Sequence, residues 1–183
     1  ESRFRVPRIG IFYGSTDGHT ATAATELKME LDAFALPAGE EGVELFDIAD
    51  YYLDEMLDFD CLVLGIPTWN HGQLQRDWEE VLEEFDTLDL SGKRAAVFGL
   101  GDQHGYPDTF ADAIFFLADK LRRQGASLVG AWPVDGYTFN ASWAAEDGRF
   151  LGLVLDDHNQ PDLTAPRISA WSRQIWQEFS SEP

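Results

Sequence analysis

Residues 9–20 read IGIFYGSTDGHT, a pattern typical of the first strand, turn and helix of an α/β fold. The apolar run Ile9 to Tyr13 is followed by a turn of glycines and hydroxyl residues, Gly14 to Thr20, and then by an alanine-rich segment. Such a turn binds phosphate through backbone N–H groups, hydroxyls and the positive end of the helix. Because the turn contains no lysine or arginine, it predicts a phosphate site without a permanent positive charge.

Size and charge limit the classes of protein that fit. The 183 residues, 44% of them hydrophobic, predict one compact α/β domain over residues 1–183 whose first residues, 1–7, form a flexible end. The chain has 33 acidic and 13 basic residues, and its formal net charge of −20 argues against binding to nucleic acid or to anionic membranes. A basic protein partner and a salt-adapted, strongly hydrated surface explain this charge equally well.

The reactive residue types point to a reducing compartment and to no metal site. Cys61 is the single cysteine and lies in an apolar run, so we expect a buried thiol and no intramolecular disulfide. The sequence shows neither a signal peptide nor a membrane-spanning stretch, which predicts a soluble cytoplasmic protein. The four histidines lack the spacing of metal ligands, so we expect no metal centre.

Short apolar runs alternate with longer amphipathic ones, as in βα units around a parallel sheet. Strands are expected at residues 8–13, 43–47, 61–66, 94–99 and 127–133, with a further strand piece at 150–155.

Helical spacing of apolar residues places helices between these strands. A first helix would bury Ala24, Leu27 and Leu31, and a segment over residues 108–124 would end at Gly125. A second helix would bury Leu74, Trp78, Val81 and Leu82. The last helix would have Thr164 as N-cap and Pro166 in its first turn, and its apolar stripe would pack in the core: Ile168, Trp171, Ile175 and Phe179.

Two loops with one large aromatic residue each follow the third and fourth expected strands. They read PTWNHG, residues 67–72, and GLGDQHGY, residues 99–106. Loops after the first, third and fourth strands of a doubly wound sheet converge where the strand order reverses. Trp69 and Tyr106 would then hold a planar ring between them, although either ring alone would equally serve to cover its own loop. Together the three loops predict a planar ring that carries a phosphate.

At this point the sequence resembles the long-chain flavodoxins, from about Ile9 to Phe179. The resemblance rests on the phosphate turn, both aromatic loops, the DGY sequence at 135–137 and the DDHNQPDLT sequence at 156–164. It implies a three-layer, doubly wound α/β fold with a five-stranded parallel sheet of order 2-1-3-4-5. The last strand would be interrupted by an insertion at about residues 137–150. FMN at the switch point between the first and third strands is the known arrangement of that family.

The resemblance implies FMN as a non-covalent cofactor and assigns residues to it. Trp69 and Tyr106 would flank the isoalloxazine, and the Asn70–His71 peptide would lie beside flavin N5. Its carbonyl would accept a hydrogen bond from N5–H after uptake of one electron and one proton, which would favour the neutral semiquinone. The implied contacts to phosphate and ring are Ser15, Thr16, Asp17, Gly18, His19, Thr20, Pro67, Thr68, Trp69, Asn70, His71, Gly72, Leu100, Gly101, Asp102, Gly105, Tyr106, Thr109 and His158.

Four of these residues depart from the family pattern. Asp17 brings a carboxylate to the phosphate turn, so we expect its side chain to point away or to cap the helix. His71 would add a titrating charge beside N5, and its protonation would raise the potential for the second electron. His158 would either offset Asp17 or lie exposed in solvent. Thr109 stands where a side-chain amide is frequent, so its contact to the ring does not carry over.

The resemblance implies a low-potential one-electron carrier between redox proteins, and not an enzyme. Its partners would be basic proteins such as a ferredoxin/flavodoxin–NADP reductase and an electron acceptor enzyme, and it would act as a monomer. Acidic residues such as Asp77, Glu79 and Glu80 would steer these partners. The alternative, an NAD(P)H:quinone reductase of the same fold, needs one open flavin face. A receiver-type signalling module would need an acidic cluster where this chain has the phosphate turn.

Overall fold

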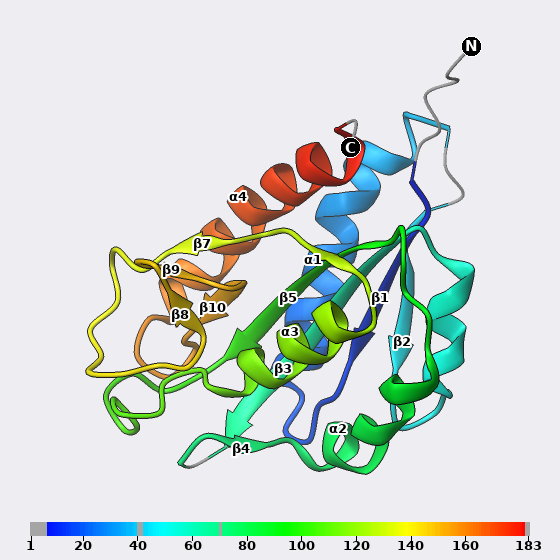
Figure 1. Ribbon diagram of the computed structural model, residues 1–183. Coiled ribbons are helices and arrows are strands. Elements are labelled where there is room, and N and C mark those ends of the chain that lie inside the picture. Colours follow the sequence, from blue (N-terminus) through cyan, green and yellow to red (C-terminus); the bar gives the residue numbers. More distant parts are fainter. Residues whose placement is uncertain (1–6, 40–41, 70, 182–183) are drawn as a thin grey trace.

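The computed structural model describes residues 7–39, 42–69 and 71–181, and for Trp69 it describes the backbone alone (Figure 1). The expected flexible end therefore lies outside the described residues except for Pro7, which is buried. Asn70 and the Trp69 side chain, both assigned to the flavin above, lie outside them as well.

Five strands form the parallel body of the central sheet. They are β1 (Ile9–Tyr13), β2 (Glu44–Asp47), β3 (Cys61–Trp69), β5 (Arg94–Leu100) and β10 (Leu153–Leu155), in the spatial order β10-β5-β3-β1-β2. This confirms the predicted order 2-1-3-4-5. In the register, Tyr13 pairs with both Asp47 and Gly65, so the carboxyl ends of β1, β2 and β3 meet at one edge. The order reverses at β1 and β3, which places the switch point at this edge.

The last strand of the sheet is split, as the resemblance implied. The short β6 (Ser127–Leu128) pairs with the start of β5, and β10 pairs with its end. Between them lies a small antiparallel sheet, visible beyond β10 in Figure 1. Its strands are β7 (Trp132–Pro133), β8 (Ala145–Glu146) and β9 (Arg149–Phe150). The interruption thus extends from residue 129 to 152, longer than the expected 137–150.

Helices cover both faces of the sheet (Figure 1). On one face α1 (His19–Ala35) and α4 (Pro161–Ser180) pack against the side chains of Ile9, Ile11 and Val63. On the other face lie α3 (Ala113–Arg123), the short α2 (Arg76–Val81) and the 3₁₀ helices η1 (Leu53–Asp58) and η2 (Leu82–Thr87). Alternating strand residues such as Ile11 and Phe12 enter opposite halves of the core because the side-chain period of a strand is two.

Several expected helix features are confirmed. Ala24, Leu27 and Leu31 are buried along α1, and Gly125 follows α3 with φ +98°, the left-handed conformation of a C′ residue. The α4 stripe is buried core, as expected: Ile168, Trp171, Ile175 and Phe179. Cys61 is also buried, and desolvation raises the pKa of its thiol to about 12, so it packs as a small apolar residue.

Several expected element bounds are wrong. Strand β3 continues past Ile66 to Trp69, and Leu74 lies in the short strand β4 (Gln73–Leu74), which pairs antiparallel with the end of β3. The segment expected to be helical from residue 108 becomes helical only at Ala113, because residues 108–112 form turns. Val81 ends α2, and Leu82 begins the 3₁₀ helix η2.

The last helix begins earlier than expected. Pro161 occupies its first turn, so Thr164 is not the N-cap and Pro166 lies inside the helix. A proline suits the first turn because its fixed φ is already helical and it lacks an N–H that would need a partner. Among the described residues, no helix combines the length and apolar character needed to cross a membrane.

Candidate cofactor site

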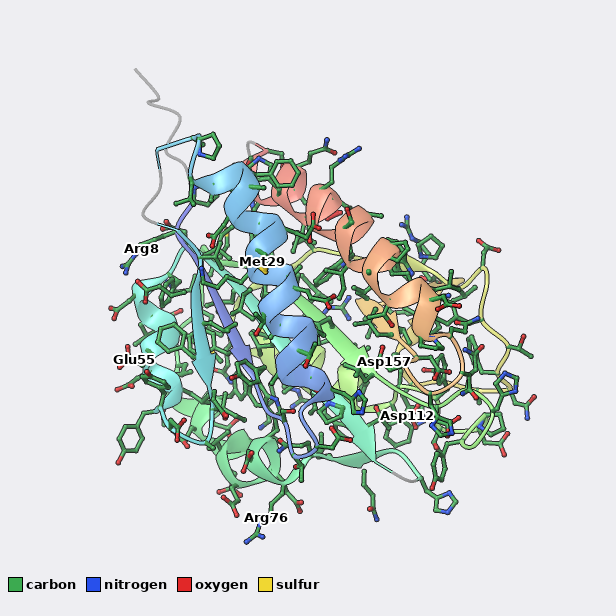
Figure 2. All side chains as sticks on the ribbon, turned by 180° about the vertical axis from the view of Figure 1, so that it is seen from behind. Arg8, Met29, Glu55, Arg76, Asp112 and Asp157 are labelled. Carbon is green, nitrogen blue, oxygen red and sulfur yellow. The ribbon has the colours of Figure 1, made fainter. Side chains whose placement is uncertain are left out.

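A cavity of about 250 Å³ lies at the carboxyl edge of the sheet, where the loops after β1, β3, β5 and β10 converge. This convergence follows from the parallel order, because the carboxyl ends of parallel strands share one edge. The lining comes from the turn after β1 and the start of α1, from the last residues of β3 and β5, and from the loops after β5 and β10. It consists of Asp17, His19, Pro67, Thr68, Leu100, Gly101, Asp102, Tyr106, Asp157 and His158. Figure 2 labels Asp157 at this end of the molecule, beside the start of α1, and Arg8 at the opposite end.

The turn between β1 and α1 is held in shape by its own side chains. Ser15 Oγ accepts hydrogen bonds from the backbone N–H groups of Gly18 (3.2 Å) and Ala21 (3.3 Å). Gly18 caps α1 with φ +89°, a left-handed conformation that glycine adopts without steric cost. The turn is therefore already folded around the helix N-terminus, where a partial positive charge favours anions.

Asp17 both caps the helix and lines the cavity. Its Oδ1 accepts the backbone N–H of His19 at 3.3 Å, as expected for a capping carboxylate. Asp17 is also one of the residues that line the cavity. A ligand phosphate in this turn would have to compete with Asp17 for that N–H group.

Thr20 carries a buried hydroxyl without a partner. The residue is fully buried, and its Oγ1 has no hydrogen-bond partner among the described residues. A buried hydroxyl of this kind costs about 1–3 kcal/mol relative to a satisfied one. A phosphate oxygen would accept a hydrogen bond from this hydroxyl. Thr20, the folded turn and the helix N-terminus together therefore fit a phosphate group.

Gln75 and Trp78, which were not among the expected site residues, hold the turn between β1 and α1 in place. Gln75 is buried, donates from Nε2 to Thr16 Oγ1 (3.2 Å) and accepts the N–H of Trp78 (3.2 Å). Trp78 in turn donates from Nε1 to the carbonyl of Gly65 in β3 (2.8 Å). A Cβ at Gly14 would lie 2.3 Å from Gln75 Oε1, so only glycine permits this approach. No local sequence pattern indicates this contact, because Gln75 and Thr16 are 59 residues apart.

The loop after β5 is organised by Asp102. Its Oδ1 accepts the backbone N–H groups of Gly105 (2.7 Å) and His104 (3.2 Å) and the side-chain amide of Asn159 (2.7 Å). Desolvation opposes ionisation, but these hydrogen bonds and the nearby His158 lower the pKa of Asp102. The ionised carboxylate thus holds the loop in the conformation that brings Tyr106 to the cavity.

Asp156, at the end of β10, ties three segments together and was also missed. This fully buried carboxylate accepts the N–H (3.0 Å) and the side-chain amide (2.8 Å) of Gln103 and the N–H of Asn159 (2.9 Å). Gln103 in turn accepts the N–H of Thr138 at 2.7 Å, within the insertion. The run Asp156-Asp157 after an apolar strand was the only sequence signal for it.

The loop after β3 packs against the loop after β5, which carries Tyr106. The His71 ring meets the Tyr106 ring edge to face, with centroids 5.5 Å apart. Gly72 has φ +83°, and a Cβ there would lie 3.0 Å from Asp112 Oδ2. Asp112 is buried, accepts the backbone N–H of Trp143 in the insertion (2.8 Å), and has a pKa raised by desolvation. Thr68 Oγ1 accepts the N–H of Ala113 at the start of α3.

The histidine interactions differ in part from the expected ones. His19 Nδ1 lies 3.4 Å from Asp157 Oδ2, a pairing that the sequence analysis did not foresee. His158 is exposed, as one of its two expectations had it, and it also lines the cavity, where it helps to lower the pKa of Asp102. Among the described residues, no group of three His, Cys, Asp or Glu side chains is placed to hold a metal ion.

The structure brings nine of the expected contacts to the cavity wall: Asp17, His19, Pro67, Thr68, Leu100, Gly101, Asp102, Tyr106 and His158. Ser15, Thr16, Gly18 and Thr20 form the turn beside it, and His71, Gly72, Gly105 and Thr109 belong to the adjoining loops without lining it. Asp157 lines the cavity and was not expected there.

Comparison with known proteins agrees with this arrangement. The sequence profile of the flavodoxin family matches residues 11–171. A flavodoxin of Picosynechococcus sp. is 44% identical over 172 residues, covering 94% of this chain and 98% of that protein. A flavodoxin of Haemophilus influenzae is 39% identical over 172 residues, covering 93% and 95%. The structure of Fusobacterium nucleatum flavodoxin bound to flavin mononucleotide has a TM-score of 0.87 at 31% identity, covering 94% of this chain and 99% of that one. The chain therefore belongs to the flavodoxin family, and its length agrees with the long-chain class.

Proposed function

We propose that this protein binds FMN non-covalently in the cavity at the carboxyl edge of the sheet and carries single electrons between redox proteins. The observation that carries this proposal is the partnerless hydroxyl of Thr20 beside a preformed anion turn. Flavodoxins are electron-transfer proteins and not enzymes. The comparisons give no support to the alternative of an NAD(P)H:quinone reductase.

Different residues around the cavity would hold the phosphate and the ring of FMN. The hydroxyls of Ser15 and Thr20 and the positive end of α1 would hold the phosphate, because the turn offers no lysine or arginine. Tyr106 would cover one face of the flavin ring, and the backbone after β3 would lie along its edge. Bound FMN supplies a ring that accepts one or two electrons.

Binding is tested directly with the purified protein. Stripped of flavin and titrated with FMN, the protein should turn yellow, quench flavin fluorescence and bind one equivalent. It should not oxidise NADPH until a reductase is added. Absence of FMN binding would refute the proposal, and steady NADPH oxidation by the protein alone would favour the reductase alternative.

The negative charge of the residues that line the cavity predicts the reduction potential of bound FMN. Three carboxylates, Asp17, Asp102 and Asp157, line it without a lysine or arginine among the lining residues. Negative charges close to a poorly hydrated ring oppose the addition of further negative charge. We therefore expect the potential for the second electron at pH 8 to lie well below that of free FMN. A spectroelectrochemical titration checks this, and a single two-electron step near the free-flavin potential would contradict it.

We further propose that basic redox proteins dock on the acidic surface beside the cavity. Glu79 and Glu80 are exposed on α2, directly after the β3–β4 loop, and Asp77 is half-buried in the same helix. Opposite charges accelerate such encounters, and salt screens them.

The docking proposal predicts a salt-dependent rate that α2 controls. Reduction by a ferredoxin/flavodoxin–NADP reductase should slow at least about tenfold between 20 and 500 mM salt. A Glu79→Lys/Glu80→Lys variant should be slower at low salt and less sensitive to salt. Glu26→Lys/Glu30→Lys on α1 is the matched control with the same change of charge. A rate independent of ionic strength would argue against steering.

The cellular setting belongs to the proposal as well. A carrier that docks briefly with different partners suits a monomer, and a reducing cytoplasm keeps the buried Cys61 a thiol. Gel filtration with light scattering should give the mass of one 20.5 kDa chain.

A further inference from the structure

Two of the four histidines line the candidate FMN cavity, and the other two lie in the loops beside it. His19, at the start of α1, and His158, after β10, line it. His71, after β3, packs its ring against Tyr106, which lines the cavity. His104 is exposed in the loop after β5, two residues before Tyr106. The histidines thus come from four segments that are far apart in the sequence and that only the fold brings together.

Histidines are the basic residues among those that line this cavity. No lysine or arginine occurs among the residues that line it. Many basic side chains of the described residues instead form ion pairs elsewhere, such as Arg8 with Glu44, Lys28 with Asp32 and Lys120 with Asp86. With four neutral imidazoles, the three lining aspartates give the site a formal charge of −3. Protonation of the two lining histidines, His19 and His158, would change it to −1, and His71 and His104 would add positive charge beside the cavity wall.

Carboxylates lie near the imidazoles of two of these histidines, His19 and His158. His19 Nδ1 lies 3.4 Å from Asp157 Oδ2, and the backbone N–H of His19 donates to Asp17 Oδ1. His158 acts electrostatically on Asp102, and His104 donates its backbone N–H to the same carboxylate. His71 faces the Tyr106 ring, and the adjoining Gly72 lies against Asp112. Protonated imidazoles would therefore neutralise the carboxylates around the ligand.

We infer that the four histidines form a proton-responsive rim that strengthens FMN binding as the pH falls from 8 to 5.5. This inference rests on the proposed FMN function and adds a regulation of the same site. A histidine side chain ordinarily takes up a proton near pH 6.5. A phosphate monoester changes from about two negative charges at pH 8 to about one at pH 5.5, and each imidazolium near the cavity attracts either form. The histidines therefore counteract the affinity that FMN loses with its own second charge. By linkage, bound FMN must raise the proton affinity of the rim histidines to the same extent.

The test compares FMN dissociation constants at pH 8 and 5.5 in the wild type and in a variant with all four histidines changed to glutamine. The ratio of the two constants should favour pH 5.5 by about tenfold more in the wild type than in this variant. The comparison cancels the titration of FMN itself, because the ligand is common to both proteins. Arg173→His, which adds a histidine at an exposed position of α4, is the control and should behave as the wild type.

Two further measurements locate the effect. A His19→Gln/His158→Gln variant should lose the larger part of the pH dependence, since these side chains line the cavity. Riboflavin, which lacks the phosphate, should show a smaller difference between wild type and quadruple variant than FMN does. NMR titration of the imidazole signals should give higher midpoints with FMN than without it, with each signal assigned from a single His→Gln variant.

The outcomes separate this inference from the proposed function. If the quadruple variant keeps the wild-type pH dependence, or if the imidazole midpoints do not move on FMN binding, the rim inference is wrong although FMN still binds. If the wild type binds no FMN at either pH, the proposed function fails and the inference falls with it.

Discussion

Replacing Thr20 with valine should weaken FMN binding by about 10- to 100-fold, because the variant loses a hydrogen bond to a charged phosphate oxygen. The same change should leave the flavin-free protein as stable as the wild type or up to about 1 kcal/mol more stable. The hydroxyl is buried without a partner in the described structure, so its removal relieves a desolvation cost. Fluorescence titration with FMN and urea unfolding of the flavin-free protein measure the two effects.

The control for this change lies on the same helix. Thr25 donates its hydroxyl to the carbonyl of Ala21 at an exposed position, so Thr25→Val should leave FMN affinity unchanged. A Thr20→Val protein that binds FMN as tightly as the wild type would show that this hydroxyl does not contact the phosphate. A variant that is clearly destabilised without flavin would show that the hydroxyl is satisfied within the protein itself.

Replacing Gly152 with alanine should destabilise the protein by about 3 kcal/mol or more, one of the largest losses expected of a single methyl group. A Cβ at this position would lie 1.9 Å from the carbonyl oxygen of Val97 in β5. That oxygen belongs to the backbone of a central strand and cannot rotate away. Gly152 is where the chain leaves the small sheet of the insertion and re-enters the main sheet as β10.

Gly148→Ala is the matched control for Gly152. Gly148 lies in the turn between β8 and β9 with φ +79° and no atom within 4 Å of an added Cβ. Its replacement should cost only the conformational penalty of about 1–2 kcal/mol. Thermal unfolding of both variants measures the difference. Equal losses for the two variants would mean that the sheet shifts to accept a methyl group at Gly152.

The parts of the fold that follow a simple period are readable in the sequence. Buried parallel strands appear as short apolar runs, and α1 shows its core face at Ala24, Leu27 and Leu31. The wrong element bounds occur where the local sequence fits two different structures. Pro161 and Pro166 both suit a helix start, and Leu74 fits a helical stripe as well as the strand β4 that it forms. Such choices depend on which partner the segment finds in the folded protein.

The candidate site likewise has parts that the sequence predicts and parts that it does not. The phosphate turn and the aromatic loops are contiguous, so their composition alone indicated a ring with a phosphate. Gln75, Asp156 and Asp157 are separated in sequence from the groups that they contact, and no local pattern shows that contact. For example, Gln75 reaches Thr16 across 59 residues, and Asp156 reaches Gln103 across 53.

The sequence by itself determined the class of fold, the order of its units and the chemistry of the loop after β1, because local spacing and local composition encode these properties. Only the tertiary structure decided that Thr20 is buried without a partner among the described residues, that Asp17 both accepts the His19 N–H and lines the cavity, and that His19 and His158 line it together. Burial and charge at a site depend on which segments the sheet brings together, and a parallel sheet gathers at one edge loops that are far apart along the chain.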